Sequence, residues 1–521
     1  MNPIAITRYG AIEGLPLEGD HVSFRGVPYA APPVGDLRWR APVDPEKWDG
    51  VRPAKEYSRA AWSLGCDMEP FVNDFYYMGY PEMSEDCLYL NVDTAFAPGE
   101  KRPVYVWFHG GGLTSGYSFE IEFDPSELVK RGIVVVTVGQ RLGLFGYLAL
   151  PQLYDEAGRA GNYGFLDQIK AMEWVRDNIA AFGGDPDNVT IGGQSGGSQK
   201  CCLLAASDRS RHLFKRIILH SGLKYRQDIP SPEEGCAAGR AFLSAMGLPE
   251  DASMETLRAI PAEEFLKNRE LYGKYATGRM VQEEGLMPWA DLRDAVLAGQ
   301  MDGFDMMVGT TLGEATKKDF YNRADAMAEF RATLGEDYAD FERLADVTDE
   351  NAFLRYRELT SLGLLPCGGT AFSRNLSLNR LFAAYMNGRD PEHKRYNFYF
   401  THLLPNRECE IGGERDSAKL LAWHTSDLWF AFNSLREGRS PYRPWRECDF
   451  ELGRVMCDYL ANFIACGDPN GEDLPEWPHG AEEYGYLVLA EDTHAVTGLT
   501  EMDRVAFRYV SREYGIEVTE C

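Results

Sequence analysis

Seven short apolar runs constrain the fold of this chain more than any other feature. They lie at 87–92, 103–108, 133–138, 188–191, 216–221, 304–309 and 396–400. Runs with so few polar residues are typical of strands that are covered on both faces, as in a mostly parallel sheet. Residues 165–182, between the third and fourth runs, carry apolar side chains at helical spacing, which predicts a strand–helix–strand crossover. The alternation of strands and helices predicts an α/β fold.

No linker rich in Pro, Ser or Gly divides the 521 residues, and the strand-like runs resume after helical stretches near 240–300 and 320–390. We therefore expect a single domain over residues 1–521, with a central mostly parallel sheet and helical insertions. Such insertions would lie over the carboxyl ends of the strands, where open parallel sheets bind their ligands.

The charge balance bears on the partners of the chain. Lys and Arg number 53 against 80 Asp and Glu, which gives a net charge of −27 and disfavours binding to nucleic acid or to an anionic membrane. The N-terminal residues lack the apolar core of a signal peptide, and no later stretch is long and uncharged enough to span a bilayer. We therefore expect a cytoplasmic protein with no membrane partner.

The eleven cysteines show neither C-x-x-C nor His/Cys spacing, so the sequence predicts no metal site and no cofactor held by cysteine. Cys66 and Cys87 could close a loop of about 20 residues through a disulfide. A reducing cytosol argues against that bond, and the sequence leaves it open.

One serine lies among four glycines in GGQSGG, residues 192–197, directly after the apolar run 188–191. Two interpretations compete. The segment is either an ordinary glycine-rich turn or a nucleophile elbow, G-x-S-x-G, which presents the Ser195 hydroxyl at the edge of a sheet. Taken alone, the motif favours the ordinary turn, because a chain with 52 glycines can contain G-x-S-x-G by chance.

A second glycine cluster supports the catalytic interpretation. HGGG, residues 109–112, directly follows the apolar run 103–108 and precedes the serine motif in the chain. Consecutive glycines let backbone N–H groups point into one small volume, where they can bind an oxyanion. We expect such a hole to be formed by Gly111 and Gly112 together with the N–H of Gly196, whereas His109 is expected to be structural.

A nucleophilic serine also needs a base and an acid, which follow it in the order acid, then histidine, in this type of fold. Five histidines lie far enough along the chain to be the base: His393, His402, His424, His479 and His494. His424 lies in a turn-like stretch after the run 396–400, and His402 is its main rival. Glu314 follows the run 304–309 and is the favoured acid, although spacing alone leaves both assignments open.

Long blocks over almost the whole chain resemble the type-B carboxylesterases, a family that also includes cholinesterases and bacterial para-nitrobenzyl-type esterases. The blocks are FRGVPYAAPPVGDLRW (24–39), SEDCLYLNV (84–92), HGGG (109–112), the segment 161–197, LFKRIILHSG (213–222), AWHTSDL (422–428) and FIACGDPN (463–470). The resemblance implies the α/β-hydrolase fold, with Ser195 as nucleophile, Glu314 as acid and His424 as base. It also implies two internal ion pairs, Arg38 with Glu85 and Arg141 with Asp167.

The chain departs from the family pattern at informative positions. Members usually carry Glu and Ala beside the serine, where this chain has Gln194 and Gly196, and they usually have Asp-Glu-Gly around the acid, where this chain has Gly-Glu-Ala. Cholinesterase-like members bind choline with a tryptophan between the positions of Cys66 and Cys87, and this chain has none there. Aromatic residues of that segment either line an entrance or pack in the core; they are Phe71, Phe75, Tyr76, Tyr77 and Tyr80.

Together these features predict a serine carboxylic-ester hydrolase that acts on neutral short-chain alkyl or aryl esters and needs no metal or cofactor. Its partner would be a small-molecule ester, and its oligomeric state is left open. One alternative is an esterase specialised for one natural ester, such as an acylated sugar, a phenolic ester or a toxin ester. Another is a non-catalytic interaction domain, against which the retained serine, acid, histidine and glycine donors argue.

Overall fold

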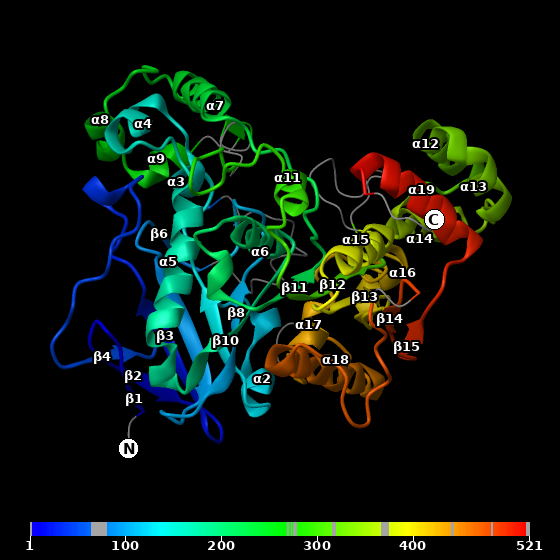
Figure 1. The fold of residues 1–521 in the computed structure, drawn as a ribbon, viewed down its shortest axis with the longest axis horizontal. Helices are drawn as coiled ribbons and strands as arrows, with labels where there is room; N and C mark the ends of the chain where they lie inside the picture. The colour runs from blue at the N-terminus through cyan, green and yellow to red at the C-terminus, as the bar shows by residue number, and fades with distance from the viewer. Residues whose placement is uncertain are drawn as a thin grey trace. The chain divides into compact units, whose positions relative to one another are not determined.

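The computed structural model describes residues 3–63, 81–267, 270–271, 274, 279–314, 319–365, 375–438, 442–480 and 483–516. The chain forms two compact units (Figure 1). The first comprises Met1–Lys215 with Asp228–Gln300, and the second comprises Arg216–Gln227 with Met301–Cys521. Each unit contains a sheet with helices packed against it, so the predicted α/β class is confirmed. The single domain over residues 1–521 stays a prediction.

The sheet of the first unit has the strand order β1-β2-β3-β7-β9-β8-β10, with β4 paired to β2 and a separate pair β5-β6. The strands are β1 (Ile4–Ile6), β2 (Ala11–Pro16), β3 (His21–Pro28), β4 (Val51–Ala54), β5 (Ala60–Ala61), β6 (Met83–Ser84), β7 (Tyr89–Ala95), β8 (Arg102–Phe108), β9 (Val134–Val138) and β10 (Gly184–Gln194). Strand β7 is antiparallel to both of its neighbours, whereas β9, β8 and β10 are parallel.

The parallel core of this sheet fixes where the functional loops begin. Phe108 of β8 lies opposite Val138 of β9 and Gly193 of β10, so the three strands end at the same level. The segments that follow them therefore leave the sheet side by side, at the edge where open parallel sheets bind their ligands.

The crossover predicted over residues 165–182 is present as α5 (Tyr163–Asn178) and the 3₁₀ turn η5 (Ile179–Phe182). Helix α5 lies along the sheet and contacts β10 (Figure 1). The other helices of this unit are α2 (Ser126–Lys130), α3 (Gly143–Tyr147), α4 (Pro151–Ala157), α6 (Gly196–Ala206), α7 (Pro232–Ala245), α8 (Met254–Ala259), α9 (Ala262–Leu266) and α11 (Leu292–Leu297), with the 3₁₀ turns η1 (Gly35–Leu37), η4 (Ile121–Phe123) and η6 (Arg211–Leu213).

The sheet of the second unit has the order β11-β12-β13-β14-β15, and its first four strands are parallel. They are β11 (Arg216–His220), β12 (Asp305–Thr311), β13 (Arg395–Phe400) and β14 (Tyr486–Leu489), followed by the antiparallel β15 (His494–Val496). The helices are α12 (Arg323–Leu334), α13 (Tyr338–Leu344), α14 (Ala352–Leu359), α15 (Leu376–Arg389), α16 (Ser417–Leu420), α17 (Leu428–Ala431), α18 (Glu447–Cys466) and α19 (Glu501–Tyr514), with the turns η7 (Gly335–Asp337), η8 (Thr360–Leu364) and η9 (Glu408–Glu410).

The predicted apolar runs coincide with β7 to β13, and the sequence missed the strands at the edges. Strands β1 and β15 are only three residues long and have mostly exposed side chains, so neither gives the longer apolar run of a buried strand. Among the described residues, no helix is both long enough and apolar enough to cross a membrane.

Two ion pairs, one fully buried and one partly buried, hold loops of the first unit in place, as the family resemblance implied. Arg141, just after β9, contacts Asp167 of α5 through two bonds of 2.6 and 2.8 Å, and both side chains are at most 2% exposed. Arg38 contacts Glu85 in the same bidentate manner at 2.5 and 2.6 Å. Cys87 is buried, and burial raises the pKa of its thiol well above the usual value. Cys66 and the aromatic residues at 71–80 lie outside the described residues.

We predict that Asp167→Ala lowers the free energy of unfolding by about 3–5 kcal/mol, because the Arg141 guanidinium would stay buried without its carboxylate. Urea denaturation followed by circular dichroism measures the loss. Lys130→Ala, which removes the pair with Glu127 where the lysine is 60% exposed, is the control and should cost less than about 1 kcal/mol. Equal losses in the two variants would contradict the prediction.

Candidate active site

Ser195 occupies a tight turn between β10, which ends at Gln194, and α6, which begins at Gly196. Its backbone angles are φ 55° and ψ −111°, a conformation that residues other than glycine rarely adopt. The Ser198 hydroxyl donates to the Gly193 carbonyl at 2.7 Å and closes the turn from the helix side. Such a strained strand-to-helix turn is the geometry of a nucleophile elbow, which holds the serine hydroxyl away from its own backbone.

The glycines around Ser195 are required by close contacts rather than by flexibility. A Cβ atom at any of the four positions would approach a neighbouring atom closer than 2.4 Å. The nearest atoms are the Tyr105 hydroxyl oxygen for Gly192, the Gly197 carbonyl carbon for Gly193, the Gly112 nitrogen for Gly196 and the Phe108 carbonyl oxygen for Gly197. At three of the four positions the nearest atom belongs to the backbone, so the elbow is packed largely backbone to backbone.

Residues 109–116, here called the glycine loop, follow β8 and pack against the first turn of α6. Gly111 and Gly112 adopt positive φ angles of 81° and 64°. The Gly111 carbonyl accepts hydrogen bonds from the backbone N–H groups of Thr114 at 3.3 Å and Ser115 at 3.0 Å, so it faces its own loop. A Cβ atom added to Gly196 would lie only 2.2 Å from the backbone nitrogen of Gly112. The structure thus brings Gly112 and Gly196, two of the three predicted oxyanion donors, next to each other.

In the second unit, Glu314 and His424 form a hydrogen-bonded pair. His424 Nδ1 lies 2.7 Å from Glu314 Oε2, and the carboxylate is fully buried while the imidazole is 21% exposed. The other carboxylate oxygen accepts from the Thr310 and Thr311 hydroxyls at 3.3 and 3.2 Å. Gly313 donates its N–H to the Ala422 carbonyl at 2.7 Å, which ties the segment carrying the acid to the segment carrying the histidine.

The other histidines considered as bases make different contacts. His402 Nε2 lies 2.6 Å from Asp449, and both side chains are at most 3% exposed. His393 pairs with Asp390 at 2.9 Å, and His479 accepts the backbone N–H of Arg395 at 3.0 Å. His494 is exposed, and its ring contacts the backbone carbonyl of Asp492. Among the five candidates, His424 is the one whose ring contacts Glu314, while the Asp449 pair gives His402 a structural role.

Comparison with known proteins identifies the family. The model of the carboxylesterase family matches residues 1–508 of this chain. The chain belongs to the carboxylesterase family.

Curated and solved relatives agree with this assignment. A para-nitrobenzyl esterase of Bacillus subtilis (strain 168) is 33% identical over 372 residues, which cover 69% of this chain and 73% of that protein. A fumonisin B1 esterase of Sphingopyxis macrogoltabida is 40% identical over 280 residues, 50% of this chain and 46% of the other. A solved PNB esterase superposes with a TM-score of 0.74 at 26% identity and covers 97% of this chain and 100% of its own. The chain is therefore an ester hydrolase of the α/β-hydrolase fold.

The sequence missed another histidine–carboxylate pair in the second unit of this carboxylesterase. His220, at the end of β11, lies 2.7 Å from Asp427, and both side chains are buried. Asp427 follows His424 by three residues, so this contact fixes the segment that carries the proposed base. Its residues lie within the matched blocks 213–222 and 422–428, but nothing in their spacing shows that they meet.

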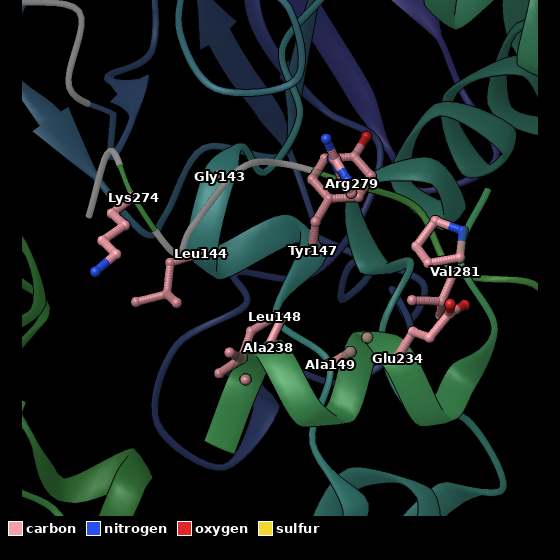
Figure 2. Close-up of a pocket in the computed structure, with 13 residues that line it drawn as sticks. Gly143, Leu144, Tyr147, Leu148, Ala149, Glu234, Ala238, Lys274, Arg279 and Val281 are labelled. Atoms are coloured by element: carbon pink, nitrogen blue, oxygen red, sulfur yellow. The ribbon is translucent and has the colours of Figure 1, made fainter. Parts of the chain in front are cut away.

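A cavity of about 420 Å³ lies in the same unit of the carboxylesterase as Ser195 (Figure 2). Residues 143–149 and helix α7 provide much of its wall, with apolar side chains such as Leu144 and Leu148 and the charged side chains of Glu234, Lys274 and Arg279. The N–H of Gly143 in this wall donates to the carbonyl of Leu113 in the glycine loop at 2.7 Å. The cavity wall and the glycine loop are therefore joined directly.

We predict that Gly196→Ala lowers kcat at least tenfold (about 1.4 kcal/mol), although alanine is usual at this position in the family, because its Cβ would displace the Gly112 backbone. Steady-state hydrolysis of p-nitrophenyl acetate measures the effect. Gly388→Ala is the control, since a Cβ there meets nothing within 4 Å. An unchanged kcat in Gly196→Ala would show that the glycine loop does not depend on this close approach.

Proposed function

We propose that this carboxylesterase hydrolyses neutral short-chain alkyl or aryl esters through Ser195, His424 and Glu314, with the N–H groups of Gly111, Gly112 and Gly196 as oxyanion donors. The observation that carries the proposal is the strained elbow at Ser195, since a positive φ at a serine has a cost that an ordinary turn would avoid with glycine. The 2.7 Å contact between His424 and Glu314 supplies the second part of the argument.

The chemistry follows from these groups. Ser195 Oγ attacks the ester carbonyl carbon while its proton passes to Nε2 of neutral His424, whose Nδ1 faces Glu314. The carboxylate stabilises the imidazolium, and the backbone N–H groups stabilise the negative charge on the former carbonyl oxygen. The imidazolium then gives its proton to the departing alcohol, which leaves an acyl-serine. Water attacks the acyl-serine by the same steps and releases the acid and the free enzyme.

The cavity beside the glycine loop supports the substrate class. Its size suits a small ester group, and its apolar side chains suit an alkyl or aryl substituent. The name of the para-nitrobenzyl esterase given above is that of an enzyme for para-nitrobenzyl esters, which are alkyl esters with an aryl substituent and agree with this choice. A second candidate is a specialised ester with a charged group, which the charged residues Glu234, Lys274 and Arg279 of the wall favour.

We predict that Ser195→Ala abolishes ester hydrolysis and retains the wild-type melting temperature, because the serine contributes chemistry and little packing.

His424→Ala should lower kcat by about 10⁴-fold, as loss of a triad histidine does. His402→Ala is the matched control and should lower the melting temperature through loss of the buried Asp449 contact, with kcat nearly unchanged. Comparable kcat losses in the two histidine variants would contradict the assignment of His424 as the catalytic base.

We also predict the substrate order in a panel of kcat/KM values. Neutral acetate and butyrate aryl esters should be hydrolysed well, and a choline ester should not exceed its isosteric neutral analogue by tenfold, or about 1.4 kcal/mol. The reason is that the segment between Cys66 and Cys87 contains no tryptophan to receive the cation. An ester with a charged acid group that outperforms every neutral ester would favour the specialised alternative.

A further inference from the structure

A lysine side chain is completely buried in the helix that begins at the proposed nucleophile. Lys200 lies on α6 five residues after Ser195, and its exposed fraction is 0%. An ammonium group taken out of water costs several kcal/mol unless hydrogen bonds and an opposite charge compensate it. The hydrogen bonds of Lys200 therefore show which parts of the chain compensate its burial.

Lys200 bonds to the start of the glycine loop. Its Nζ donates to the backbone carbonyl of His109 at 2.8 Å. Gln140, with its amide oxygen facing Lys200, accepts from Nζ at 3.0 Å and from His109 Nε2 at 2.9 Å, while its amide nitrogen donates to the Val138 carbonyl at 3.2 Å. The Lys200 side chain thus links α6 to Gln140, which follows β9, and to His109, the first residue of the HGGG motif.

The ionisable groups facing Lys200 come from three elements. Burial lowers the pKa of Lys200 to about 7, against the opposing effect of the Glu120 carboxylate, while burial raises the pKa of Glu120 to about 7. Glu122 shares a hydrogen bond with Glu120. Burial and then the Lys200 charge lower the pKa of His109, against the opposing effect of its contact with the Gly110 carbonyl. Burial raises the pKa of the Cys201 thiol, so Lys200 and Glu120 are the two groups of this set whose pKa values lie near 7.

We propose that Lys200 is a positioning residue for ester hydrolysis, which holds the glycine loop against α6 through the His109 carbonyl and so aligns the N–H groups of Gly111 and Gly112 with that of Gly196. This inference rests on the proposed function, because it concerns the donors assigned there.

The physical basis is the position of the bonded carbonyl. The His109 carbonyl belongs to the peptide whose nitrogen is that of Gly110, so its direction sets the direction in which the HGGG backbone leaves β8. The glycines that follow have no side chains to anchor them, and Gly111 and Gly112 already occupy positive φ angles. A bond from a charged donor is roughly twice as strong as one from a neutral donor, which makes the ammonium form of Lys200 the better anchor.

The test is Lys200→Met, which keeps the length of the side chain and removes its donors. We expect kcat for p-nitrophenyl acetate to fall about 10²-fold, the size of effect seen when one oxyanion donor is lost, with KM within about threefold of wild type. The inhibition constant of a trifluoromethyl ketone, which forms a tetrahedral adduct with the serine, should weaken by the same factor as kcat/KM.

Ser207→Ala is the matched control. Ser207 ends α6, and its buried hydroxyl donates to the Leu286 carbonyl at 2.6 Å, so this variant also removes one buried bond from a side chain to a carbonyl. It should lower stability and leave kcat unchanged. A kcat within threefold of wild type in folded Lys200→Met, or a loss that appears in KM alone, would overturn the role of Lys200. Ser195→Ala in the same assay tests the proposed function separately, because its activity does not depend on what Lys200 does.

The pH profile gives a second measurement that does not need Lys200→Met to fold. The wild-type kcat should rise with pH as the His424 base becomes neutral. Since the ammonium is the stronger anchor, kcat should then decline at higher pH as Lys200, whose pKa burial lowers to about 7, loses its proton. Glu120→Gln removes the carboxylate that favours the charged form, so the decline should move to lower pH. Profiles of wild type and Glu120→Gln that coincide would overturn the part of the proposal that assigns the anchoring to the charged form of Lys200.

Discussion

The close approach of one backbone segment to another at the end of β10 is the constraint on which the functional part of the first unit depends. Parallel pairing ends β8, β9 and β10 at one level, so the segments that follow compete for the same space. Side chains do not fit there, as the short distances at Gly193, Gly196 and Gly197 show. In this chain, the absence of Cβ atoms at these positions lets the start of α6 lie against the glycine loop.

Contacts between histidines and carboxylates serve different purposes in the described part of the second unit. Three histidines pair with carboxylates at 2.6–2.7 Å: His220 with Asp427, His402 with Asp449 and His424 with Glu314. The first two imidazoles are at most 3% exposed, whereas that of His424 is 21% exposed. A buried pair can only join two elements of the fold. A pair whose imidazole is partly exposed can also take part in chemistry, so exposure separates the candidate base from the two buried imidazoles.

The sequence predicted the centre of the fold because buried parallel strands leave an apolar signal. The runs that became β8, β9 and β10 are of this kind, and the glycine clusters after β8 and β10 marked the turns at their ends. The short edge strands left no such signal. Residues that act through distant contacts were also invisible, since Lys200 meets His109 across 91 positions and His220 meets Asp427 across 207. Only the folded chain shows that these residues touch. Glu314 and His424 could be proposed because the family resemblance implied their roles, while their spacing after the strands left both assignments open.

The positive φ of Ser195 affects how the protein would respond to selection for stability. A non-glycine residue held at a positive φ is destabilising by about 1–3 kcal/mol, a sizeable share of the 5–15 kcal/mol that keeps a typical domain folded. The protein therefore retains Ser195 although glycine would make this turn more stable. Directed evolution that screens for heat resistance without assaying turnover would tend to replace Ser195 with glycine, and the most robust variants from such a library would be inert.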